Sequence, residues 1–183
     1  DPTLRFAWDE RGLLLLVKVR DDVVTEYQSI SALCEKDSLE IFMATAPGSP
    51  DRFQLSVGPG ADPRHPKARL FFFDHRKTKF HGNLTAEAAG RKTEDGYQVE
   101  LLLPWKNLNI APEIGNEVAF QILVNDSDIP GPRYGADWFR SFWHPLGHAG
   151  FNTRAMHRRR PFVSRAVGCP ADSCGWTCAG VRR

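Results

Sequence analysis

Residues 95–105 carry the strongest structural signal in the chain, and they read Asp95-Gly96-Tyr97-Gln98-Val99-Glu100-Leu101-Leu102-Leu103-Pro104-Trp105. The Asp-Gly pair predicts a turn, because glycine adopts positive φ at little cost. Apolar side chains then occupy every second position, so the following strand has one apolar face. Pro104 lacks an amide hydrogen and ends the ladder, so a short turn is expected after it. Nothing in this stretch is chemically reactive, and function is expected on the loops that the strand supports.

The same alternation recurs along the chain between short Gly- and Pro-containing turns. Strands are expected over residues 6–8 and 13–20, which form a hairpin, over 37–43, 53–57 and 118–125, and more weakly over 70–73 and 84–88. Helical periodicity is scarce. Many short strands of this kind predict an all-β fold, an antiparallel β-sandwich of the jelly-roll or immunoglobulin-like type with few or no helices.

The length and charge of the chain exclude several classes of protein. A length of 183 residues favours one domain, and 24 Lys and Arg against 22 Asp and Glu leave a formal net charge of only +2. This charge gives no field that would favour nucleic acid or an anionic membrane. The longest apolar run, 13–17, is far shorter than the roughly 20 residues that span a bilayer. We therefore expect no nucleic-acid binding and no membrane insertion.

The end of the chain differs in composition from the rest. A basic cluster at residues 154–160 is typical of solvated surface. Three of the four cysteines follow within residues 169–178, and no histidine lies beside them to complete a zinc site. We expect residues 1–165 to form one domain and residues 166–183 to be a disordered or non-native tail. Because the chain opens at Asp1 without a starting Met, we also expect it to be a fragment.

Catalysis has little support in the sequence. Pairs of carboxylates could serve a glycosidase, but each pair has a structural explanation as a turn, a strand start or a polar strand face; the pairs are Asp21/Asp22, Asp37/Glu40, Glu94/Asp95 and Asp126/Asp128. No nucleophile, zinc-protease or nucleotide-binding motif is present. We expect a binding protein with no catalytic residues.

Two segments have side chains suited to binding. In Asn125-Asp126-Ser127-Asp128, Asp126 and Asp128 offer the oxygen ligands that calcium prefers, and an Asx-type turn that caps a strand is the alternative. The densest aromatic group includes Trp138 and Trp143. Indole rings stack on the apolar faces of sugars, while ordinary core packing is the alternative for part of this group.

Several stretches, in this order, resemble the family 9 carbohydrate-binding modules first associated with xylanases. They are Ala7–Leu13 with Val17–Asp22, Asp37–Phe42, Gly96–Glu100 with Leu103–Trp105, and Val124–Asp128. The resemblance covers roughly residues 6 to 151. It implies a β-sandwich that binds sugar between stacked aromatic rings, with structural calcium nearby. The family's opening segment before Ala7 is absent, so we expect the sandwich of residues 1–165 to lack its N-terminal strand.

The resemblance also implies which residues contact the sugar. By position, Trp143 is one stacking residue. Family members often carry a Trp just before the Asp-Ser-x-Glu strand, where this chain has Leu33-Cys34-Glu35-Lys36, so Tyr27 from the same loop, or Trp138, is the candidate for the second ring. Hydrogen bonds to sugar hydroxyls are expected from Glu35, Asn125 and Arg140. Calcium is the one expected cofactor.

We therefore expect a noncatalytic module that binds an oligo- or polysaccharide. It would target a larger polysaccharide-degrading protein, such as a glycoside hydrolase acting on xylan or cellulose, to its substrate. Related DOMON-type sandwiches hold haem for electron transfer, and Met43, Met156 and the histidines keep this alternative open. A structural or interaction domain with a decayed sugar site is the other alternative. The resemblance implies an extracellular, periplasmic or cell-surface location; the oligomeric state is left open.

Overall fold

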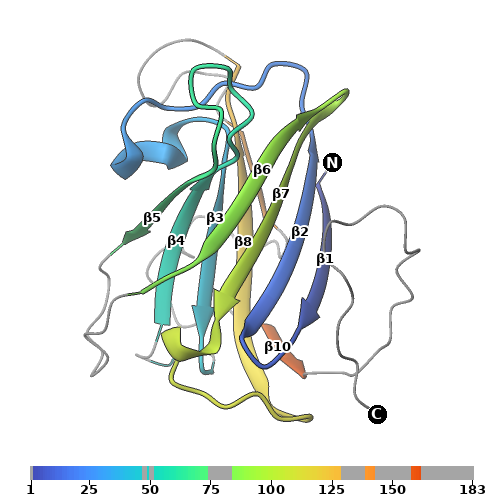
Figure 1. The fold of residues 1–183 in the computed structure, drawn as a ribbon, viewed down its shortest axis with the longest axis vertical. Helices are drawn as coiled ribbons and strands as arrows, with labels where there is room; N and C mark the ends of the chain where they lie inside the picture. Colours follow the sequence, from blue (N-terminus) through green and yellow to red (C-terminus); the bar gives the residue numbers. More distant parts are fainter. Residues whose placement is uncertain are drawn as a thin grey trace.

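The computed structural model describes residues 2–46, 49, 52–73 and 84–128 in full, and the backbone of 139–142 and 158–161. It is a β-sandwich of two antiparallel sheets, which confirms the predicted fold class (Figure 1). The first sheet has the order β1-β2-β7-β6, with β1 (Thr3–Trp8), β2 (Gly12–Arg20), β6 (Glu87–Thr93) and β7 (Gly96–Pro104). The second has the order β10-β8-β3-β4-β5, with β3 (Ser38–Ala44), β4 (Arg52–Gly58), β5 (Arg69–Phe73), β8 (Glu117–Asp126), β10 (Arg158–Pro161) and, also paired with β8, β9 (Phe139–Phe142).

The segment 95–105 forms the strand that the sequence predicts. β7 pairs with β2 along its whole length, and the register aligns their apolar positions: Leu13↔Leu103, Leu15↔Leu101, Val17↔Val99 and Val19↔Tyr97. All of these side chains are buried between the sheets. A shift of one residue would turn every one of them to the outside, so burial fixes the register.

The second sheet completes the core with every second residue of its central strands. These residues are Leu39, Ile41 and Met43 of β3, Phe53, Leu55 and Val57 of β4, and Val118, Phe120, Ile122 and Val124 of β8. The intervening residues of the three strands therefore point away from the first sheet.

Trp105 joins the hairpin turn to the end of β7. The short helix η2 (Trp105–Asn107) begins directly after Pro104, as the proline predicts. The Trp105 indole is buried and donates a hydrogen bond from Nε1 to the Asp9 carbonyl oxygen at 2.8 Å. Its backbone N–H donates to the Arg11 carbonyl oxygen at 3.1 Å. Trp105 is thus a packing residue and not an exposed aromatic platform.

Two elements differ from the expectation from sequence. β6 lies at Glu87–Thr93 rather than 84–88, because the turn after Thr93 sets the hairpin register, which runs from Thr93↔Gly96 back to Glu87↔Leu102. Part of the basic cluster at 154–160 forms the backbone of β10, paired with the first half of β8. Ladder hydrogen bonds come from backbone groups, so a strand does not need apolar side chains there. The expected tail, 166–183, lies outside the described residues.

Helical structure is limited to η1 (Ile30–Glu35) and η2 in the described part of the chain, as expected. Neither is long and apolar enough to cross a membrane.

The edge strand β6 approaches the loop after β4 closely at Gly90, and a substitution there tests this approach. A Cβ built on Gly90 would lie 1.6 Å from the Pro59 carbonyl oxygen, so alanine cannot fit without moving β6 or the loop after β4. We expect Gly90→Ala to lower the free energy of unfolding by about 1–3 kcal/mol, measured by urea denaturation. Ala89→Val, at the exposed neighbouring position, is the control and should change it by less than about 0.5 kcal/mol. Equal stability of the two variants would contradict this close approach.

Candidate functional site

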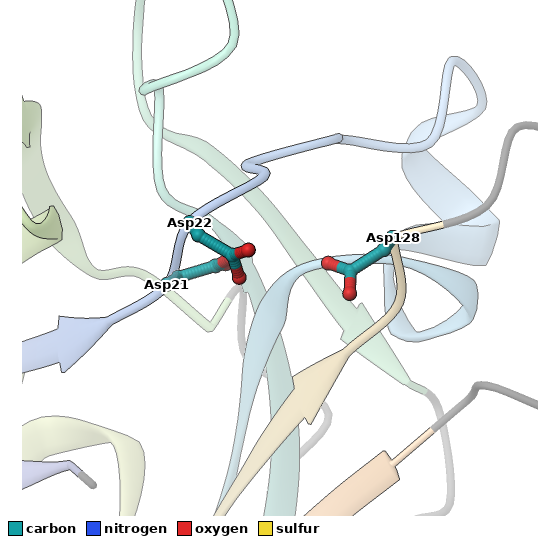
Figure 2. A group of neighbouring side chains, drawn as sticks. All are labelled: Asp21, Asp22 and Asp128. Carbon is teal, nitrogen blue, oxygen red and sulfur yellow. The ribbon is translucent and has the colours of Figure 1, made fainter.

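The ends of three strands bring carboxylates together at one end of the sandwich. Asp21 follows β2, Asp37 precedes β3 and Asp126 is the last residue of β8. One oxygen from each carboxylate lies within 4.8 Å of the others. Asp21 belongs to a second group with Asp22 and Asp128, whose ligand atoms satisfy the same distance (Figure 2). The sequence prediction named Asp126 and Asp128, and the structure adds Asp21, Asp22 and Asp37 beside them.

Asp37 also joins the 21–37 loop to the end of β8. Its carboxylate accepts hydrogen bonds from the backbone N–H groups of Thr25 and Ser127, the latter at 2.8 Å. The Thr25 hydroxyl donates to the Ser127 carbonyl oxygen at 2.8 Å, and Lys36 Nζ lies 2.9 Å from the Ser127 hydroxyl. Segments about a hundred residues apart in the chain are thus held against one another by one buried carboxylate.

The electrostatics of this end fit a cation. Burial, reinforced by the nearby Asp21 and Asp126 charges, raises the pKa of Asp37 to about 8, and burial also raises the pKa of Asp21. The Tyr97 hydroxyl is buried and has no hydrogen-bond partner among the described residues. Burial and the charges of the same three carboxylates hold its pKa well above its ordinary value. A donor set made of oxygen atoms alone suits calcium or magnesium rather than zinc.

A second feature is a row of buried polar side chains on the outer face of the second sheet. They alternate with the core residues, and we call them the polar cluster: Ser38, Glu40, Gln54, Ser56, Gln121 and Asn125. Glu40, with 0% of its surface exposed, accepts hydrogen bonds from Gln54 Nε2 at 2.7 Å and from Asn125 Nδ2 at 3.1 Å. The Asn125 amide also donates to the Ser38 hydroxyl at 3.0 Å. An apolar set would stabilise a buried face better, so this polarity points to a ligand.

The predicted sugar-contacting residues are only partly brought together. Asn125 is a fully buried member of the polar cluster, bonded within the sheet rather than on a surface loop. Arg140 lies opposite Asn125 in the register between β8 and β9. Tyr27 is half-buried in the 21–37 loop, and the half-buried Glu35 ends η1 in the same loop.

Other predicted residues lie away from these features. Trp138 and Trp143 lie outside the described residues. Cys34 belongs to η1 and is buried. Met43, the haem ligand of the alternative hypothesis, is packed in the core, and Met156 is outside the described residues.

The 21–37 loop is held over the second sheet by a buried ion pair. Arg69 Nη2 lies 3.1 Å from Glu26 Oε2, and the Glu26 side chain is 0% exposed. The same guanidinium donates to the carbonyl oxygens of Tyr27 at 2.7 Å and Gln28 at 3.1 Å. Glu26 Oε1 accepts from the backbone N–H groups of Ala61 at 2.9 Å and Asp62 at 3.2 Å. We call these contacts of Glu26 and Arg69 the clasp. Through the Tyr27 carbonyl oxygen, the clasp sets the backbone position of Tyr27.

Asp62 closes the other side of the clasp. Its carboxylate accepts from the Glu26 N–H at 3.0 Å and pairs with Arg64 at 2.5 Å. The Arg64 guanidinium holds the pKa of Asp62 below its usual range. The clasp therefore connects the 21–37 loop, the loop after β4 and the start of β5.

Most residues of the polar cluster were missed in the sequence, although a usable signal was present. Gln54, Ser56 and Gln121 each interrupt an apolar strand at the positions that point away from the core. A solvent-exposed strand face also has polar residues at every second position. Alternation alone therefore does not distinguish an exposed polar face from a buried polar face.

The fold and these sites agree with a known family. The sequence model described as carbohydrate family 9 binding domain-like matches residues 1–139. The chain belongs to this family. It is therefore a carbohydrate-binding domain, and membership implies that the domain is noncatalytic.

Solved structures of carbohydrate-binding module family 9 share the fold. One, from Caldicellulosiruptor kristjanssonii in complex with glucose, superimposes with a TM-score of 0.67 at 19% identity, covering 93% of this chain and 80% of that one. Another from the same organism, in complex with cellotriose, gives a TM-score of 0.54 at 21% identity, covering 73% of this chain and 62% of that one. Identities this low support the fold alone. The comparison with curated protein sequences returns no significant match.

The ion pair within the clasp can be tested through stability. Arg69→Met keeps an unbranched apolar side chain but leaves the Glu26 carboxylate buried without its cation, so the free energy of unfolding should fall by about 3 kcal/mol. Arg20→Met is the control, because Arg20 pairs with Asp95 at 3.4 Å on the exposed surface and should contribute less than about 1 kcal/mol. Urea denaturation measures both, and an Arg69 effect no larger than the Arg20 effect would show that the clasp is not a stabilising element.

Proposed function

We propose that this family 9 domain binds the glucose- or xylose-based chains of cellulose or xylan through the polar cluster. The observation that carries this proposal is the buried Glu40 carboxylate bonded to two side-chain amides on an outer sheet face. Sugar hydroxyls both donate and accept hydrogen bonds. Adjacent carboxylate and amide groups can therefore hold two neighbouring hydroxyls in one orientation.

Aromatic stacking would supply the apolar part of the binding energy. Trp143, Trp138 and Tyr27 remain the candidates for it. The clasp supports Tyr27, because Arg69 fixes its backbone before any ligand arrives and so reduces the entropy lost on binding. Glu35 and Arg140 remain candidates for further hydrogen bonds. Arg140 is supported by its register position opposite Asn125, a member of the polar cluster.

The acidic end of the sandwich is proposed to hold structural calcium. Asp21, Asp37 and Asp126 would bind one ion, with Asp22 and Asp128 available for a second beside Asp21. Calcium accepts several oxygen ligands in flexible geometry, and a dication would keep the buried Asp37 ionised despite its raised pKa. The ion would bind the start of β3 to the ends of β2 and β8.

In its biological setting, the domain is proposed to target a larger polysaccharide-degrading protein to its substrate outside the cell. Family membership supports this proposal, because a noncatalytic binding domain acts by bringing another activity to the glycan.

Glycan binding through the polar cluster predicts a specific loss on mutation. Gln54→Leu removes one amide beside Glu40 at similar volume, and it should weaken binding of cello- or xylo-oligosaccharides about tenfold in isothermal titration calorimetry. Gln98→Leu is the matched control, because Gln98 is also a buried strand glutamine but lies on the first sheet. If the unmodified chain binds neither cello- nor xylo-oligosaccharides, the proposed function is refuted.

Calcium binding predicts a rise in thermal stability. Adding calcium at about 100 times its dissociation constant to chelator-treated protein should stabilise the fold by about 2.7 kcal/mol, seen as a higher Tm. Asp21→Asn should reduce this rise strongly, because Asp21 belongs to both carboxylate groups. Asp95→Asn, an exposed carboxylate at the same end, should leave it unchanged. A Tm that does not respond to calcium would contradict the site.

A further inference from the structure

Two aromatic side chains of the edge strand β5 lie on the same outer face as the polar cluster. The register pairs Ser56 with Phe71 and Gln54 with Phe73. Cross-strand partners in an antiparallel pair point to the same face of the sheet, so both rings point away from the core. The residue between them, Phe72, points inward and packs against Phe53 with ring centroids 5.9 Å apart.

The two outward rings form one aromatic surface. Phe71 and Phe73 lie with centroids 4.9 Å apart at an interplanar angle of 88°, an edge-to-face contact that orients each ring against the other. Both are only half-buried, although they are as apolar as the core residues behind them. The clasp borders this surface at the start of β5. Arg69, the first residue of β5, pairs with Gly58 in the register, and the Glu26 carboxylate lies directly over Gly58.

The polar cluster continues up to this aromatic surface. Successive register pairs lead from Glu40 to Ser56 and from Ser56 to Phe71. The Ser56 hydroxyl is buried and has no hydrogen-bond partner among the described residues. A buried hydroxyl without a partner costs stability, and a ligand hydroxyl would satisfy it. The sequence of groups across β3, β4 and β5 is thus carboxylate, unpaired hydroxyl and aromatic ring.

We propose that Phe71 and Phe73 form a platform for a second sugar ring of the bound oligosaccharide, with the Ser56 hydroxyl bonded to that ring. This inference rests on the proposed function and extends it to chain length. Strand spacing puts Phe71 about 10 Å from Glu40, so the platform lies beside the polar cluster and not above it. A pyranose ring has hydroxyls at its edge and apolar C–H groups on its face, the combination that these neighbouring groups complement.

The consequence is a preference for longer glycans. A monosaccharide held by the polar cluster would not reach the platform, whereas cellotriose would. Calorimetric titration of the full chain with glucose and with cellotriose should give tighter binding of cellotriose. Phe71→Ala should weaken cellotriose binding about tenfold and leave glucose binding unchanged. Phe71→Trp offers a larger ring and should retain or increase the preference, which keeps the test valid if the alanine variant folds poorly.

Phe72→Leu is the matched control on the same strand. It should lower stability through its contact with Phe53 and leave the ratio of the two affinities unchanged. If the unmodified chain binds both sugars with equal affinity, or if Phe71→Ala keeps the preference for cellotriose, the platform is refuted while glycan binding stands. If the unmodified chain binds neither sugar nor any other glycan, the proposed function and the platform both fall.

Discussion

The pairing of β2 with β7 is the constraint on which the rest of the molecule depends. Its register buries an apolar face on each strand and ends at Arg20↔Gly96. Because both strands meet there, the Asp21 N–H can donate to the Asp95 carbonyl oxygen at 2.9 Å, and Tyr97 enters the core beside Val19. Gly96 allows this closeness: its φ is +144°, and a Cβ would lie 2.1 Å from the Val19 carbonyl oxygen. The pairing of β2 with β7 thus sets the position of Asp21 at the acidic end.

The central strand β3 connects the two sites through its two faces. Leu39, Ile41 and Met43 fill the core, and Ser38 and Glu40 point to the other side, where they meet Asn125 and Gln54. Both faces are buried, and the outer one combines the polar Ser38 and Glu40 with the apolar Phe42. Hydrogen bonds among the side chains reduce the cost of burying Glu40, since each bond replaces one to water. The proposed recognition of sugar hydroxyls would give this network a role other than stability.

The sequence predicts the scaffold far better than the sites, because alternation is a local property and a site is not. The alternation around Val99 identifies a strand without knowledge of its neighbours. The meeting of Asp21, Asp37 and Asp126 depends on which strands pair and in which direction, so each residue alone has the appearance of a turn or a strand start. Asn125 was predicted as a sugar contact, but its place in the polar cluster beside Ser38 and Glu40 depends on the register between β8 and β3, which the sequence alone does not show. Phe71 and Phe73 were hidden within an unbroken aromatic run, in which the alternation of faces is invisible.

The 21–37 loop joins the acidic end to the polar face, and its fixed points explain why so long a connection can carry function. At one end Asp37 holds the Thr25 and Ser127 backbones beside the carboxylates. Glu26, the neighbour of Thr25 in the sequence, is bonded to the loop after β4 and to Arg69 on β5. Tyr27 follows immediately and is held through its carbonyl oxygen by the same arginine. Thr25, Glu26 and Tyr27 are consecutive. If Thr25 is displaced together with the Asp37 carboxylate, the clasp must therefore either break or be displaced as well. The geometry of the acidic end and the placement of the loop over the outer face of the sheet are therefore mechanically connected through three residues.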